Sequence, residues 1–328
     1  MRRITARLLE RSLASGARSA EAYAKIGETL GVGLDAASGL QATHTAEGGI
    51  GLRVFRDNGA EGFACACGAR AGGTDEARLV EAAIAAARSP REPFPLARGK
   101  VRDERGLGIF DPRLETATQA DLEELLEETT AETMRIDPRV RRLDTAFLAA
   151  STSRVRIDNT EGFTGSYKQT LFHLRMGVDA RDADRSILVG QSQTARRLTA
   201  FSPTLFADRT ARLAITTLEG RPPATGRFPA LLAPRAAIEL LRLFAGTLPP
   251  AGLAAGRRVA APAVSIIDDG RLPGGVHRQL AEVVVAQLHG GSRGDDGHLL
   301  VGRVDRGVLG ADGDVGTRDA LVGSGRLP

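Results

Sequence analysis

Residues 50–66 read IGLRVFRDNGAEGFACA, and this stretch predicts a β-hairpin. Apolar residues alternate with small or charged residues over 50–55, and a second strand-like run returns over 62–66. Between the two runs, Asp57-Asn58-Gly59 supplies the residue types that tight hairpin turns favour. Together with the helices and strands expected on both sides of it, this hairpin predicts an α+β protein.

Amphipathic helices are expected on both sides of the hairpin. Ile4, Leu8 and Leu13 share one helical stripe before it. After it, Thr74 is expected to cap a helix that runs to about Arg88. With short strands at 20–26 and 31–36, these elements predict an N-terminal α/β unit with a β-hairpin, a domain over residues 1–90.

A linker and a second domain follow. Residues 91–117 contain Pro93, Pro95 and Pro112 and are interpreted as a proline-rich linker or arm. A helix is expected over 119–135, whose acidic residues are interpreted as a solvated face. Period-two patterns at 140–149, 153–157, 163–178 and 186–193 predict an antiparallel sheet, and Pro203 opens a further helix. Residues 118–220 therefore predict a middle domain, an antiparallel sheet with flanking helices.

The last part of the chain, residues 226–328, is expected to form a β-rich C-terminal domain. Strands are predicted at 228–232 and 259–267, with a helix over 234–248 between them. Residues 276–328 are anomalous, because they contain no Phe, Tyr, Ile, Met, Lys, Asn or Cys. Two interpretations stay open: a natural divergence, and a shifted reading frame that leaves the domain incomplete.

The composition is that of an ordinary globular protein, with 42% hydrophobic and 26% charged residues. A net charge of +4 is small for 328 residues, so no nucleic-acid partner is expected. A long apolar window is absent from the sequence, so neither a signal peptide nor a membrane span is expected and the protein is predicted to be cytoplasmic. The two cysteines, Cys65 and Cys67, are interpreted as small buried residues, with a metal or redox role as the alternative.

A series of short motifs runs in a set order from residue 16 to residue 275. They are Ala20-Glu21-Ala22-Tyr23, Gly49–Phe55 with Gly59 and Gly62-Phe63-Ala64, Phe110-Asp111-Pro112, Asp137-Pro138-Arg139-Val140, Asn159–Phe163, Pro223–Leu232 and Asp268–Gly275. In their order and spacing they resemble the TldD/PmbA metallopeptidase family. The resemblance implies a three-part cytoplasmic subunit with a barrel-like last domain, of a kind that works in pairs to degrade or trim unfolded peptides.

The resemblance also implies where a zinc site would stand. Catalytic members of the family carry a His-Glu-x-x-x-His helix, in which two imidazoles hold zinc and the Glu accepts a proton from the bound water. At the matching positions this sequence has Ala233, Pro234 and Ile238, which have no metal-binding side chain. The chain thus resembles the PmbA-like (TldE-like) members, with no catalytic residue and no metal site of its own. A TldD-like partner subunit is expected to carry the zinc, in a hetero-oligomer that binds an extended peptide.

Two other functions stay open at this stage. The chain could act alone as a peptidase through an unrecognised site, or it could be a non-functional, frame-shifted remnant. The run Gly290-Gly291-Ser292-Arg293-Gly294 fits the Gly-x-Ser-x-Gly pattern of serine hydrolases. Asp295-Asp296-Gly297 follows it where a helix is required, so a glycine-rich turn is the better interpretation.

Overall fold

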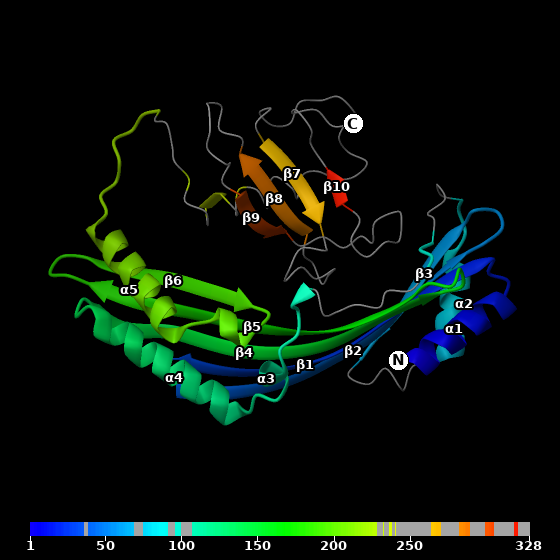
Figure 1. The fold of residues 1–328 in the computed structure, drawn as a ribbon, viewed down its shortest axis with the longest axis horizontal. Helices are drawn as coiled ribbons and strands as arrows, with labels where there is room; N and C mark the ends of the chain where they lie inside the picture. The colour runs from blue at the N-terminus through cyan, green and yellow to red at the C-terminus, as the bar shows by residue number, and fades with distance from the viewer. Residues whose placement is uncertain are drawn as a thin grey trace. The chain divides into compact units, whose positions relative to one another are not determined.

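The computed structural model divides into two compact units, Met1–Pro93 with Gly99–Ala224, and Phe94–Arg98 with Thr225–Pro328. Figure 1 shows the chain coloured from its N-terminus to its C-terminus. The residues that the structure describes are 1–35, 39–68, 75–90, 96–99, 107–227, 232, 236, 237 and 240, and the strand backbone at 264–269, 282–288, 299–304 and 318–320.

The first unit is built on one long, curved, six-stranded sheet (Figure 1). Every neighbouring pair of its strands is antiparallel, and the order across the sheet is β3-β2-β1-β4-β5-β6. The strands are β1 (Ser19–Asp35), β2 (Gly39–Phe55), β3 (Glu61–Cys67), β4 (Val140–Asn159), β5 (Thr164–Arg181) and β6 (Ser186–Ala195). The α+β class and the antiparallel sheet with flanking helices are confirmed.

The strands are longer than the sequence patterns predict. The runs at 20–26 and 31–36 form one strand, β1, and the runs at 140–149 and 153–157 form one strand, β4. β1 pairs with β4 from Glu21↔Asn159 to Asp35↔Thr145. Strands from the predicted N-terminal and middle domains therefore lie in one sheet.

Six helical segments accompany this sheet: α1 (Arg2–Ala14), α2 (Glu76–Ala86), α3 (Pro112–Glu115), α4 (Gln119–Ile136), the 3-10 turn η3 (Leu198–Ala200) and α5 (Pro203–Glu219). Asp75, rather than the predicted Thr74, caps α2, because its carboxylate accepts a hydrogen bond from the Arg78 N–H. Thr118 and Asp121 form a capping box at the start of α4. Pro203 stands in the first turn of α5, as predicted.

Both groups of helices cover the same face of the sheet. Figure 1 shows α1 and α2 at one end of the sheet and α4 and α5 at the other. Ala20, Ala22 and Ala24 of β1 pack in the core under α1 and α2, and Val32 packs in the core under α4. These residues are an even number of positions apart on one strand, so they point to one face. This face is called the helix face below, and the opposite side is called the open face.

Gly62 lets α2 approach the sheet closely. A Cβ atom at Gly62 would lie 2.0 Å from the carbonyl oxygen of Ala83 and 2.6 Å from the nitrogen of Ala87. On the open face, the ring of Phe63 lies over Gly51, 3.2 Å from where a Cβ would stand. Gly62 and Gly51 are thus places where a backbone or a ring fills the space of a side chain.

The second unit contains an antiparallel sheet of β7 (Val264–Asp269), β8 (Glu282–Leu288), β9 (Leu299–Val304) and β10 (Arg318–Ala320) in the order β10-β7-β8-β9. The strand predicted at 259–267 overlaps β7. Most of the predicted segments 228–232 and 234–248 lie outside the described residues. Among the described helices, none is long and apolar enough to cross a lipid bilayer.

Candidate functional site

The three positions where the resemblance leads us to expect the zinc motif, Ala233, Pro234 and Ile238, lie outside the described residues. Their side chains carry no nitrogen, oxygen or sulfur that could bind zinc, so this donor set does not fit the metal. Within the described ranges, no group of three or more His, Cys, Asp or Glu side chains could hold a metal ion.

Two histidines fall in the described part of the chain. The His44 imidazole is exposed, with its Nε2 4.0 Å from a carboxylate oxygen of Glu28. His173 on β5 is hydrogen-bonded through Nδ1 to the Thr194 hydroxyl of β6, at 3.2 Å. Burial, and then the charge of Arg175, lower the pKa of His173.

A hollow of about 670 Å³ lies on the helix face where the sheet is not covered. Its walls include Ile26 and Leu30 of β1 and Ala46 of β2, and Leu114 of α3 forms another part of the wall. The carboxylate of Glu115 receives ion pairs from Lys168 and, at 3.7 Å, from Arg154, so the charged groups at this rim are paired.

β6 is the edge strand of the sheet, since it is the last strand in the described order and pairs with β5. Its sequence, SILVGQSQTA, contains no charged residue and no proline. Natural edge strands usually carry such residues to prevent pairing with another chain. The side chains of its open face, from Ser186 to Thr194, are all exposed. β6 is therefore the last strand of the described sheet, with an uncharged sequence and a polar open face.

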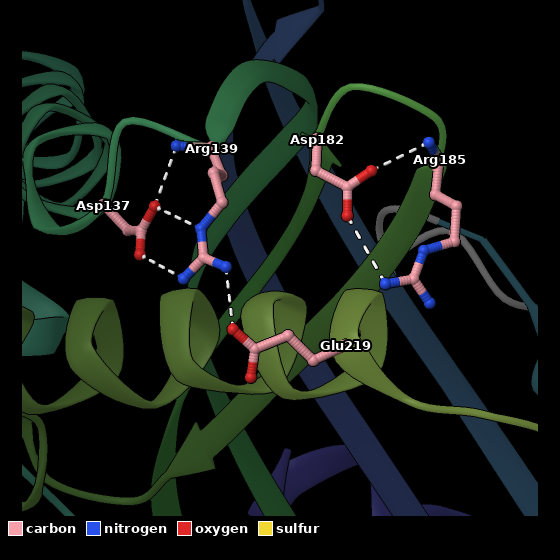
Figure 2. A network of polar contacts seen from close by, with 5 residues as sticks. All are labelled: Asp137, Arg139, Asp182, Arg185 and Glu219. Carbon is pink, nitrogen blue, oxygen red and sulfur yellow. Dashed lines mark hydrogen bonds and ion pairs between the residues drawn. The ribbon is translucent and has the colours of Figure 1, made fainter.

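A polar network fixes the turn that leads into β6 (Figure 2). Asp137, at the C-cap of α4, accepts hydrogen bonds from the Arg139 guanidinium at 2.9 and 3.1 Å, and Arg139 Nη1 donates to Glu219 of α5 at 2.7 Å. The hydrogen bonds from Arg139 lower the pKa of Asp137 to about 2. In the β5–β6 turn, Asp182 accepts from the backbone and the guanidinium of Arg185. The network joins α4, β4 and α5 beside the start of β6.

Arg185 also ties this turn to α5, because its Nη1 donates to the carbonyl oxygen of Gly220 at 3.1 Å. Asp137-Pro138-Arg139-Val140 is one of the motifs that carry the family resemblance, and the sequence alone predicts no long-range contact for these residues. The Asp-x-Arg spacing signals a local ion pair, whereas the contact with Glu219 joins residues 80 positions apart.

Asp111 anchors the other end of β6. Its carboxylate caps α3 through the Arg113 N–H at 2.9 Å, and also accepts the Leu198 N–H at 2.8 Å. The Asp111 N–H donates to the Thr170 hydroxyl of β5 at 2.9 Å. This buried residue therefore joins the segment before α3 to β5 and to η3, directly after β6.

Aromatic packing reinforces the same region. The ring of Phe201 lies between Phe172 of β5 and Phe206 of α5, with centroid distances of 4.6 and 6.0 Å. Phe172 and Phe206 are fully buried in the core under α4 and α5. The aromatic rings thus pack beside the end of β6 that Asp111 anchors.

The interpretation of the two cysteines as buried residues is wrong. Cys65 and Cys67 are free thiols and both are exposed. β3 is the second edge of the sheet, and α2 covers only its helix face, where Ala64 and Ala66 pack against the core. The cysteines occupy the alternate positions, on the open face.

Comparison with known proteins agrees with this architecture. Residues 112–218 match the family described as the PmbA/TldA metallopeptidase central domain. This match begins directly after Asp111 and contains α3, α4, β4, β5, β6 and α5. No curated protein matches the sequence.

Solved structures share the fold over 99% of this chain. A proposed modulator of a DNA gyrase from Thermotoga maritima has a TM-score of 0.73 at 18% identity, and 69% of that chain is covered. Another proposed modulator of DNA gyrase, from Bacteroides thetaiotaomicron, has a TM-score of 0.69 at 14% identity with 70% covered. TldE from Thermococcus kodakarensis has a TM-score of 0.65 at 15% identity with 68% covered. Residues 112–218 thus match the central domain of the PmbA/TldA metallopeptidase family, and the fold of the chain is the one that these solved structures share.

Proposed function

We propose that this chain is the non-catalytic, peptide-holding subunit of a cytoplasmic metallopeptidase system. A second, zinc-bearing subunit of the same family would cleave the unfolded or extended peptide that this chain helps to hold. The observation that carries the proposal is the residue set Ala233, Pro234 and Ile238 at the family's zinc positions. A methyl group, a pyrrolidine ring and a branched hydrocarbon cannot bind a divalent cation or accept a proton from water.

We propose strand addition as the way in which the chain holds a peptide, with β6, the last strand of the described sheet, as the strand to be tested. A peptide that adds to a sheet edge is bound through its main chain, so recognition does not require a fixed sequence. That property suits a system that acts on unfolded peptides of varied sequence. The contacts of Asp111 and of Arg139 hold the two ends of β6, and a strand held in this way loses less entropy when a peptide binds to it.

Co-expression with a family member that carries His-Glu-x-x-x-His tests the partnership. We expect the two chains to co-purify, with zinc bound in proportion to the motif-bearing chain. A variant of that chain with both motif histidines replaced by alanine is the control, and it should still co-purify while zinc is lost. Zinc at one equivalent per chain in the isolated protein would reject the proposal, and so would a failure of the two chains to associate.

A further inference from the structure

Cys65 and Cys67 stand side by side on the open face of β3. They are two positions apart on one strand, so their side chains point to the same face. The register places Cys65 opposite Gly51 and Cys67 opposite Gly49. Both neighbours on β2 lack a Cβ atom, and the Cys67 sulfur lies 3.7 Å from where a Cβ of Gly49 would stand. The pair is exposed, with Gly49 opposite Cys67 and the Phe63 ring over Gly51, opposite Cys65.

The spacing of the pair is unsuited to a mutual disulfide and suited to a bridging ion. Same-face neighbours on a strand are about 6.6 Å apart, because each residue advances the strand by about 3.3 Å. A disulfide needs Cβ atoms only about 3.5–4.5 Å apart. An ion with metal–sulfur bonds of about 2.3 Å would need sulfurs roughly 4.6 Å apart, which two side chains can reach by leaning toward each other.

We propose that Cys65 and Cys67 form a dithiolate site for a soft, closed-shell cation such as Cu(I). Soft thiolate ligands select Cu(I), whereas structural zinc is held by four ligands. On binding, each thiol loses its proton to solvent and each sulfur donates one electron pair to the ion. One Cu(I) thus displaces two protons and leaves a complex with one net negative charge. No electron is transferred when copper is supplied in the Cu(I) state.

The test is a competition for Cu(I) between the full, reduced chain and a chromogenic Cu(I) chelator under anaerobic conditions. We expect one Cu(I) per chain in the native protein. Cys65→Ser and Cys67→Ser should each bind at least about 100-fold more weakly, because the second thiolate acts at high effective concentration. Under the same conditions, Zn²⁺ should bind much more weakly than Cu(I).

A matched variant distinguishes the effect of the position of the two thiols from the effect of their number. Ala66→Cys in the Cys67→Ser background keeps two thiols on β3 but places them on opposite faces of the strand. We expect this variant to bind Cu(I) no better than Cys67→Ser does, with an unchanged circular dichroism spectrum. Equal Cu(I) affinity in the native chain and the matched variant would overturn the proposal, as would one copper shared between two chains in size-exclusion chromatography.

Discussion

Gly62 offers a sharp test of the packing between α2 and the sheet. Its replacement by alanine places a methyl carbon 2.0 Å from the Ala83 carbonyl oxygen, where ordinary contacts begin at 3.4 Å. The backbone of α2 would have to move by roughly 1.4 Å, the difference between these values, and overpacking of this kind costs about 1–3 kcal/mol. Because the clash is with backbone atoms rather than with a flexible side chain, we expect a loss near 3 kcal/mol.

Thermal unfolding followed by circular dichroism measures the effect of Gly62→Ala. For a unit of this size each kcal/mol lowers Tm by about 2–4 °C, so we expect Tm to fall by roughly 6–12 °C. Gly190→Ala is the control, since a Cβ there meets no atom within 4 Å and the backbone dihedral φ is not positive. The control should keep or slightly raise Tm, because alanine reduces the entropy of the unfolded chain. A Tm for Gly62→Ala within 2 °C of the native value would refute this account of the packing.

Three other predictions concern β6 and the contacts that hold it. Asp111→Ala should lower the free energy of unfolding by about 2 kcal/mol through the lost cap and the unpaired Leu198 N–H, and Asp111→Asn should lower it less; urea titration measures both. Asp137→Asn should be less stable than the native protein at pH 6. That difference should shrink as the pH falls from about 4 toward 2, because the depressed pKa of Asp137 stabilises the fold only while the carboxylate is charged; Tm against pH measures it. Ser192→Pro and Gln193→Pro each remove one N–H group of β6. Successive N–H groups alternate in direction, so one of the two variants loses an outward N–H and the other loses an N–H that points toward β5. The variant that keeps its Tm should lose binding of a fluorescent unfolded peptide, and unchanged binding in both variants would exclude β6 as the peptide edge.

The hairpin shows how much of the fold the sequence could predict. Its turn was found because Asp57-Asn58-Gly59 is a local signal, and Gly59 adopts a φ of 77°. The beginning of β2 at Gly39 was missed because residues 39–47 are exposed on both faces, so no apolar alternation marks them. β1 was divided in two because Gly27, Gly31 and Gly33 resemble breaks. In the fold, Gly31 makes room for the ring of Phe147.

The pairing of β1 with β4 could not be predicted from local patterns. It joins residues more than 100 positions apart, and period-two alternation does not say which strands are neighbours. The positions of β3 and β6 at the sheet edges depend on the same long-range order. For this reason the exposure of Cys65 and Cys67 and the position of β6 as the last strand of the described sheet follow only from the structure.

Peptide hydrolysis by the purified chain alone is the most direct test of the proposed function. The isolated chain should leave an unfolded fluorogenic peptide intact, with or without a zinc chelator. Its mixture with a motif-bearing partner should cleave the peptide and lose that activity on chelation. Cleavage by the isolated chain that stops when the metal is removed would contradict the account.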